Sequence, residues 1–336
     1  MRKIQHLINK IIIPEWRLPT KYLLPLIVLI SGLSSQVQAD SSDWLMKINK
    51  AAAETSFSGT FVYFHDGKIE AMEVARRIDN GLMQERLYSL NGEPREVIRG
   101  MDKVWCYIPD QNVVVHDYRQ ASRSGFPRIL PGDIDQLQKH YSFSEGKVKR
   151  IANRMAQQIL VVPNDRFRYG YNLWADVDTG LLLRSDLVDS RSNIIEQYLF
   201  VEVEIGGEIS DQQLAPVSKA EKLQLFGNTT PLSAPAKSSE WLVAKLPAGY
   251  TLSKHIRRLS PMDSGEVEHM VFTDGLSTVS VFIKKAHAGQ SDMNGLSRMG
   301  AVHAYRITVG NHRITVMGEV PADTVEYLAA GVAYTQ

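Results

Sequence analysis

The stretch from Tyr169 to Phe200 constrains the fold more than any other, because two turns divide it into runs of alternating apolar residues. Asp176 to Gly180 predicts the first turn, since Asp and Thr side chains bond to nearby backbone and glycine supplies a positive φ. A second turn is predicted from Asp189 to Asn193. The pattern predicts a meander of antiparallel strands with one apolar face, and by itself it is that of an ordinary β core. The apolar residues recur at strand-like spacing: Tyr171, Leu173 and Ala175, then Leu181, Leu183 and Leu187, then Ile195, Leu199 and Val201.

Residues 1–39 have the layout of a secretory signal peptide. Five basic residues precede an apolar run from Tyr22 to Leu33, and Val37-Gln38-Ala39 offers the small residues that signal peptidase requires. The run is short for a membrane span, although an uncleaved anchor is the alternative. We therefore expect export and cleavage after Ala39.

Charge and cysteine content restrict which classes of protein the exported chain can belong to. The sequence has 38 basic and 37 acidic residues; five basic residues and one acid lie in residues 1–39, which leaves 33 against 36 and a net charge of −3. A weakly acidic exported protein is a poor candidate for nucleic-acid binding. The single cysteine, Cys106, excludes a disulfide framework, and its place in an apolar strand pattern favours simple packing.

The residues from 40 to 211 predict one large sheet. A helix is expected at 42–54, where Trp44, Ile48 and Ala51 share one apolar stripe, and a second at 133–141. Strands without intervening helices imply an antiparallel sheet that curls into an incomplete β-barrel with helices on its concave side. The sequence leaves open whether that space is filled or holds an apolar ligand. The expected strands are residues 60–64, 69–78, 83–89, 96–98, 103–108, 113–118, 147–152, 155–163 and 166–174.

A segment from Arg119 to Pro131 interrupts these strands. Its mixture of Arg, Ser, Gly and Pro residues is typical of a solvated connection. The alternative is a mobile lip at the mouth of a cavity, where Arg119, Arg123 and Arg128 would contact phosphate groups.

A second, smaller α+β domain is predicted at 239–336, after a linker at 212–238 that is rich in small, polar and proline residues. Asp274-Gly275 and Gly310-Asn311 predict tight turns, and Val325, Leu328 and Val332 form one stripe of a closing helix. Its expected strands are residues 241–246, 250–259, 267–272, 278–283, 301–309 and 312–316.

The sequence holds no organised catalytic motif. None of the eight histidines after residue 39 has zinc-type spacing with a second ligand, and no Gly-x-Ser-x-Gly elbow occurs. Glu268 and His269 would point to opposite faces of a strand, and Asp176 and Asp178 are explained by their turn. We expect no catalytic residue, no metal and no cofactor, so the chain is interpreted as a non-enzyme; a secreted hydrolase is the hypothesis with least support.

Several segments resemble a known family. Leu173 to Arg184 reads LWADVDTGLLLR, which is similar to the strand-turn-strand signature of the LolA/LolB-like lipoprotein-binding fold. The continuation Ser185-Asp186-Leu187 and Glu196-Gln197 resembles the RseB/MucB family. Three segments after the linker are similar to the C-terminal domain of that family: HMVFTDGLSTVSVFI at 269–283, SRMGAV at 297–302 and VMGEVP at 316–321.

This resemblance implies a periplasmic negative regulator of the envelope-stress sigma factor. Such a protein binds the periplasmic domain of a membrane anti-sigma factor of the RseA/MucA type and protects it from site-1 cleavage. It is released by mislocalised lipopolysaccharide or lipoprotein acyl chains. A periplasmic lipoprotein or lipid carrier is the alternative function, and homodimerisation stays open.

The candidate site residues follow from these expectations. Positions that would line a ligand cavity are Phe61, Tyr63, Val74, Trp105, Tyr107, Leu173 and Leu183. The phosphate contacts would come from Arg119, Arg123 and Arg128. The anti-sigma partner is expected at Val271, Phe272, Val281 and Phe282.

Overall fold

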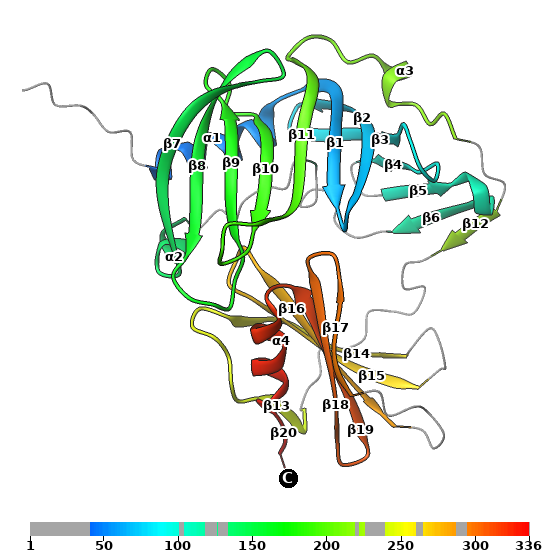
Figure 1. The fold of residues 1–336 in the computed structure, drawn as a ribbon. Coiled ribbons are helices and arrows are strands. Elements are labelled where there is room, and N and C mark those ends of the chain that lie inside the picture. The colour runs from blue at the N-terminus through cyan, green and yellow to red at the C-terminus, as the bar shows by residue number, and fades with distance from the viewer. Residues whose placement is uncertain are drawn as a thin grey trace, which may run out of the picture. The chain divides into compact units, whose positions relative to one another are not determined.

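Two separate sheets, one of twelve strands and one of six, carry most of the chain (Figure 1). The computed structural model describes residues 41–100, 104–117, 126, 134–218, 222–225, 239–259, 265–286 and 294–335. These residues belong to one unit, Ala39–Gln336. The predicted signal peptide and the predicted phosphate contacts Arg119, Arg123 and Arg128 lie outside the described residues.

The large sheet is open and almost wholly antiparallel, so the predicted incomplete barrel is confirmed. Its order is β12-β6-β5-β4-β3-β2-β1-β11-β10-β9-β8-β7, and its two ends, β12 and β7, are not paired with each other. The pairing of β1 with β11 joins the two halves. The strands are β1 (Phe57–His65), β2 (Lys68–Asp79), β3 (Leu82–Ser89), β4 (Glu96–Arg99), β5 (Val104–Ile108), β6 (Val113–Asp117), β7 (Tyr141–Ile151), β8 (Arg154–Pro163), β9 (Gly170–Asp176), β10 (Leu182–Val188), β11 (Ile194–Ile205) and β12 (Lys222–Leu225).

The predicted turn at Asp176 to Gly180 is present between β9 and β10. The Asp176 carboxylate accepts hydrogen bonds from the amide of Thr179 at 2.9 Å and from its hydroxyl at 2.8 Å, and Gly180 has a φ of +82°. Arg154 donates to the same carboxylate at 2.6 Å from β8. The turn therefore fixes the register of three neighbouring strands with one carboxylate.

Helices cover one part of the large sheet. Helix α1 (Ser41–Glu54) buries Leu45 and Ile48 in the same cluster as Leu173 of β9, and helix α2 (Ile134–Gln138) adds Leu137. The predicted helix at 133–141 is too long, because Tyr141 begins β7. Residues 141–144, Tyr-Ser-Phe-Ser, do alternate between apolar and polar side chains, but this run of four is short and adjoins the predicted helix, so the start of β7 was missed.

The smaller sheet has the order β14-β15-β16-β19-β18-β17 and is covered by helix α4 (Ala322–Ala329). Val325 and Leu328 of α4 are fully buried with Val281 and Val316 of the sheet. Strand β17 was not predicted, because its residues are largely exposed and show no apolar alternation. The strands are β14 (Thr251–Leu259), β15 (Glu266–Thr273), β16 (Thr278–Lys285), β17 (Gly295–Met299), β18 (Val302–Val309) and β19 (His312–Glu319), with a separate pair of β13 (Trp241–Val243) and β20 (Val332–Tyr334).

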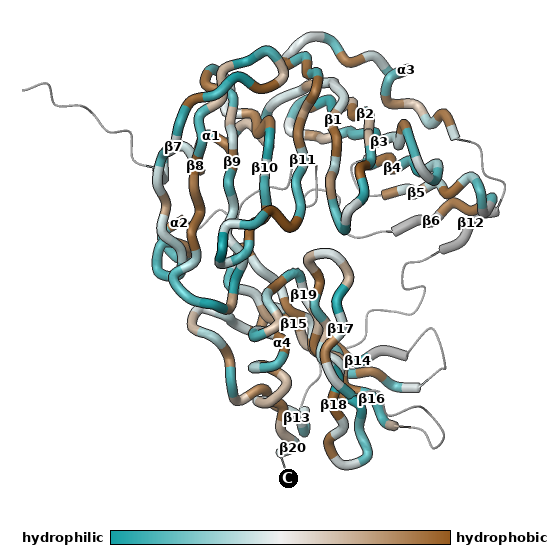
Figure 2. The backbone as a smooth tube through the Cα atoms, viewed as in Figure 1, coloured by the Kyte–Doolittle hydropathy of each residue, from teal (hydrophilic) through white to brown (hydrophobic). Residues whose placement is uncertain are grey.

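The predicted linker at 212–238 is only partly described, and its limits stay a prediction. Helix α3 (Asp211–Leu214) is preceded by its N-cap residue, Ser210. The side chains of Ser210 and Gln213 form a capping box. Strand β12 then pairs in parallel with β6. Apolar and polar residues follow one another along many strands of both sheets, β1 and β11 among them (Figure 2). Among the described helices, none has the length and apolar content needed to cross a membrane.

Candidate functional site

One face of the large sheet carries a group of aromatic side chains from β1 and β11, which we call the aromatic face: Phe57, Phe61, Tyr63, Tyr198 and Phe200. Because alternate residues of a strand point to the same side, these five share one face of the sheet. The ring centroids of Phe61 and Phe200 lie 5.8 Å apart, and those of Phe57 and Phe200 lie 5.9 Å apart. The close approach of β1 to β11 depends on Gly59, where a Cβ atom would collide with the carbonyl oxygen of Glu202.

Phe126 completes the aromatic face and was not predicted. Its ring stacks on Phe61 with centroids 4.1 Å apart and an interplanar angle of 17°, and its centroid lies 4.9 Å from that of Tyr198. Its amide donates to the Glu85 carboxylate at 3.1 Å. The sequence signal was weak, a single aromatic residue between Gly125 and Pro127. Phe126 is the one described residue of the predicted loop from Arg119 to Pro131.

A buried charge cluster lies beside these rings. The guanidinium of Arg76 lies 2.8 Å from the carboxylate of Glu85, and neither side chain is exposed. Arg76 also donates at 2.7 Å to the carbonyl of Ala52 in the last turn of α1, and its guanidinium lies 5.4 Å from the centre of the Phe57 ring. Arg99 pairs with the second oxygen of Glu85. This cluster therefore connects α1, the sheet and, through Glu85, the backbone of Phe126.

The structure brings together four of the seven predicted cavity residues. Phe61, Val74 and Leu183 are buried in one cluster, 3%, 1% and 0% exposed, and Tyr63 packs against it. Leu173 lies instead in the cluster under α1. Trp105 and Tyr107 are half-buried on β5, outside both clusters. That any of these residues contacts a ligand stays a prediction.

Tyr63 connects the aromatic face to the smaller sheet. Its hydroxyl donates to Oε2 of Glu196 at 2.5 Å, and Oε1 of the same carboxylate accepts from the amide of Ala301 at 3.2 Å. Burial, together with the Glu196 carboxylate, raises the pKa of the Tyr63 hydroxyl. Ala301 is fully buried against Leu187 of β10 and against Tyr169, which precedes β9. The Glu196 carboxylate thus links the turn between β17 and β18 to Tyr63 of the aromatic face.

A second attachment surrounds Arg168, in the segment between β8 and β9. Its guanidinium lies 3.2 Å from the Asp274 carboxylate of the smaller sheet, which also accepts from the Tyr141 hydroxyl at 3.0 Å. The rings of Tyr141 and Tyr250 lie 5.6 and 5.2 Å from the guanidinium. Strand β9 begins at Gly170 and not at Arg166 as predicted, since the Phe167 amide bonds to the Asp165 side chain in a turn.

The predicted partner residues divide between two environments in the smaller sheet. Phe272 and Val281 are 4% and 0% exposed in the core under α4. Val271 and Phe282 lie on the opposite face and are only partly buried, and the ring of His269 stacks on Phe282 with centroids 4.2 Å apart. Contact of these residues with a partner stays a prediction. Because Phe272 and Val281 are buried in the core, only Val271 and Phe282 of the four are accessible to a partner.

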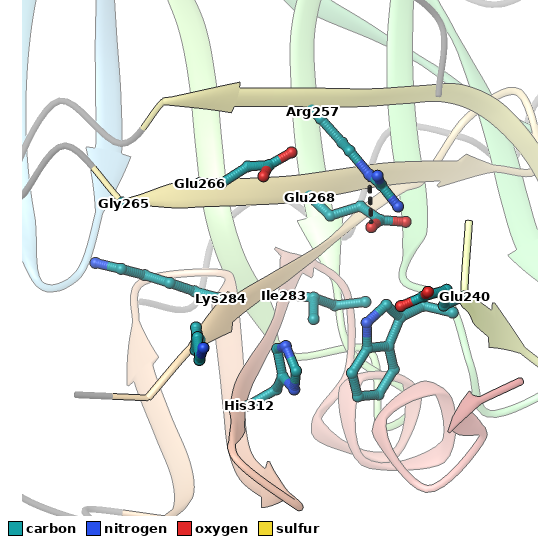
Figure 3. A pocket seen from close by; sticks show the side chains of 10 residues that line it. Glu240, Arg257, Gly265, Glu266, Glu268, Ile283, Lys284 and His312 are labelled. Atoms are coloured by element: carbon teal, nitrogen blue, oxygen red, sulfur yellow. Dashed lines mark hydrogen bonds and ion pairs between the residues drawn. The ribbon is translucent and has the colours of Figure 1, made fainter. Parts of the chain in front are cut away.

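A pocket of about 340 Å³ opens on the smaller sheet beside Trp241 and Ile283. Figure 3 shows Arg257 paired with Glu268 on one side of this pocket and His312 on another. The Glu268 carboxylate accepts from His255 at 2.7 Å and from Arg257 at 3.1 Å. His269 bonds instead to Ser280 at 3.0 Å on the other face, so Glu268 and His269 point apart as predicted.

The described residues contain no group of His, Cys, Asp and Glu side chains arranged to hold a metal ion. Burial raises the pKa of the Cys106 thiol, whereas a reactive cysteine needs a lowered pKa.

Comparison with known proteins gives matches along nearly the whole chain. The model of the MucB/RseB N-terminal domain matches residues 40–218, and that of the MucB/RseB C-terminal domain matches residues 235–333. The sigma factor AlgU regulatory protein MucB of Pseudomonas aeruginosa is 31% identical over 322 residues, which cover 93% of this chain and 97% of that protein. The sigma-E factor regulatory protein RseB of Escherichia coli is 27% identical over 311 residues, 91% of this chain and 94% of the relative.

Solved structures agree with these matches. The crystal structure of MucB in complex with MucA(peri) has a TM-score of 0.70 and 28% identity to this chain, and covers 88% of this chain and 100% of that one. The crystal structure of MucB without a named partner has a TM-score of 0.61 and 29% identity, and covers 89% of this chain and 99% of that one.

Proposed function

Because this chain belongs to the MucB/RseB family, we propose that it regulates an envelope-stress sigma factor by binding the periplasmic region of a membrane anti-sigma factor. The observation that carries the proposal is the match of both domains, together with the similarity to MucB crystallised with MucA(peri). While bound, the chain would protect the anti-sigma factor from site-1 cleavage. The predicted signal peptide supports action in the periplasm.

The second sheet favours this function over that of a lipid carrier. A carrier needs only a site for its cargo, and the aromatic face of the large sheet would be sufficient for that. The match of residues 235–333 to the C-terminal domain of a regulatory family supports a protein partner in addition. The same family membership, and the absence of a catalytic motif from the sequence, support a non-enzymatic role.

The ligand that releases the partner would be an acyl chain of lipopolysaccharide or lipoprotein, bound at the aromatic face. Phe126 already covers Phe61 there, so an acyl chain would take the place of its ring. Full burial of a Phe side chain contributes about 1.5–3 kcal/mol, and each acyl methylene about 0.8 kcal/mol. Because Phe126 is only half-buried, at most about four methylenes offset the loss of its contact, and a longer chain binds with a net gain.

Release also requires that the ligand and the anti-sigma factor be thermodynamically linked. An acyl chain shifts the equilibrium only if it binds the free form of the protein better than the complexed form. A ten- to hundredfold loss of partner affinity needs about 1.4–2.8 kcal/mol of coupling. Two to four additional methylenes, accessible only in the free form, would supply that amount at about 0.8 kcal/mol each.

Equilibrium binding of the mature chain, residues 40–336, tests the proposal. A fluorescent periplasmic segment of the anti-sigma factor from the same organism is titrated with the protein, and anisotropy is followed with and without lipid A. We expect saturable binding that lipid A weakens at least tenfold. Absence of binding would contradict the regulatory function, and transfer of lipid between vesicles by the same chain would then favour the carrier.

A further inference from the structure

We propose that Glu196 is the positioning residue that couples occupancy of the aromatic face to the attachment of the β17–β18 turn, an inference that rests on the proposed function. The two oxygens of its carboxylate bond to different sheets. Oε2 accepts from the Tyr63 hydroxyl at 2.5 Å, and Oε1 accepts from the Ala301 amide at 3.2 Å. A movement of Tyr63 therefore acts directly on the group that holds Ala301.

The β17–β18 turn, which Glu196 holds, packs closely against Glu196, Tyr169 and Leu187. Gly300 has a φ of +58°, and a Cβ atom there would lie 3.3 Å from Oε1 of Glu196. This conformation directs the next amide, that of Ala301, toward the carboxylate. The Ala301 side chain is fully buried against Tyr169 and Leu187, so the turn has little room to follow a displaced carboxylate.

Tyr63 is also the cross-strand neighbour of Tyr198, whose ring contacts the Phe126 ring that a ligand would displace. It lies directly opposite Tyr198 in the β1–β11 pairing, and the Tyr198 ring lies edge-on to Phe126 at 4.9 Å. The Tyr198 hydroxyl is buried, and burial raises its pKa. Because interiors are closely packed, an acyl chain that replaces Phe126 must shift Tyr198 and, through it, Tyr63.

Besides the Glu196 contact, the β17–β18 hairpin has a second polar contact with the larger part of the chain, at Tyr169, which precedes β9. In the second, the Tyr169 hydroxyl lies 3.2 Å from Nδ1 of His303, which also lies 2.8 Å from the carbonyl oxygen of Val320. Tyr169 does not belong to the aromatic face. The Tyr169–His303 contact therefore provides a matched control, since it attaches the same hairpin through a hydrogen bond that involves neither Tyr63 nor Glu196.

Hydrogen exchange of the peptide that contains Ala301 tests the coupling. Four proteins are compared with and without lipid A: the mature chain and its Tyr63→Phe, Glu196→Gln and Tyr169→Phe variants. Near-ultraviolet circular dichroism confirms that each variant is folded. A single lost hydrogen bond should accelerate exchange about two- to tenfold.

We expect lipid A to accelerate exchange at Ala301 in the unmodified chain. In Tyr63→Phe and Glu196→Gln the exchange should be fast already, and lipid A should add little. In Tyr169→Phe it should be faster at baseline and still respond to lipid A. A full lipid response in Tyr63→Phe and Glu196→Gln would overturn the inference.

The outcomes also separate this inference from the proposed function. If lipid A releases the anti-sigma segment while Ala301 stays protected, the coupling through Glu196 is wrong and the regulatory function stands. A different pattern would support the coupling but contradict the regulatory function. In it, lipid A does not release the segment, Tyr63→Phe accelerates exchange at Ala301, and Tyr169→Phe is the one variant of the three that keeps the lipid response of the unmodified chain.

Discussion

The guanidinium Nη1 of Arg168 lies 3.2 Å from the carboxylate Oδ2 of Asp274, and neither side chain is exposed to solvent. Arg168 comes from the segment between β8 and β9, and Asp274 from the turn between β15 and β16, so the pair joins the two sheets. The Tyr141 hydroxyl donates to the same carboxylate at 3.0 Å. Since both charges are removed from water, the Asp274 carboxylate depends on Arg168 for its cation, whereas Arg168 also pairs with Asp165 at 3.3 Å.

Arg168→Met should therefore destabilise the protein by about 3–5 kcal/mol, because the variant leaves the Asp274 carboxylate buried without its cation. Urea unfolding at pH 7 measures this loss. Arg166→Ala is the control: it removes an exposed pair with Asp323 and should change the unfolding free energy by no more than about 1 kcal/mol. Equal losses in the two variants would contradict a special role of the buried pair.

Glu96 should make the protein sensitive to acid. Burial by itself would raise the pKa of its carboxyl, but hydrogen bonds from Arg86 and from the amides of Val217 and Ser218 outweigh this and lower it. A carboxyl with a lowered pKa contributes stability that is complete above its unfolded pKa, about 4.3, and is lost as the pH falls below that value.

Unfolding free energies measured between pH 3 and pH 7 check this expectation. The unmodified chain should lose more stability below about pH 4.3 than Glu96→Gln, which has no carboxyl to protonate. Exposed Glu93→Gln should keep the full acid dependence. If Glu96→Gln and the unmodified chain have parallel pH profiles, the carboxyl does not supply this stability.

Phe126→Ala should bind acylated ligand more tightly than the unmodified chain, by several-fold, because an acyl chain no longer has to displace the ring from Phe61. The variant should also unfold slightly more easily, since it loses a half-buried aromatic contact. Quenching of intrinsic fluorescence by a brominated fatty acid reports the affinity. Phe143→Ala, on β7 and outside the aromatic face, should leave the affinity unchanged. A weaker affinity in Phe126→Ala would mean that the ring holds the ligand.

Phe282→Ala should weaken binding of the anti-sigma segment while changing stability little, because Phe282 is on the partly exposed face of the smaller sheet. Val281→Ala should do the reverse, since Val281 is fully buried beneath α4 and its truncation leaves a cavity. Anisotropy titration and urea unfolding on both variants separate the two effects. Unchanged affinity in Phe282→Ala would exclude this face as the binding surface.

The hairpins of both sheets could be predicted because their turns are encoded locally. Asp176 and Thr179 bond within five residues of each other, and Gly180 has the positive φ that the turn requires. The edge strand β17 could not be predicted, because its exposed residues do not alternate between apolar and polar. The start of β7 was missed although Tyr141 to Ser144 do alternate, because this short run adjoins the predicted helix.

The candidate site was only partly predictable, for a related reason. Phe61, Tyr63, Val74 and Leu183 could be nominated because alternation marks the inward positions of strands. Nothing near Phe126 in the sequence indicates that its ring stacks on Phe61, and nothing near Glu196 indicates that it bonds to Ala301. These contacts depend on segments that are distant in the sequence.

The parallel pairing of β12 with β6 limits how far the smaller sheet could ever travel. Because β12 ends at Leu225, only the 13 residues before Ser239 connect the sheets covalently. A fully extended chain of that length spans about 43–47 Å. A detached smaller sheet would therefore remain tethered at an effective concentration of about millimolar, and re-docking would be a fast intramolecular event.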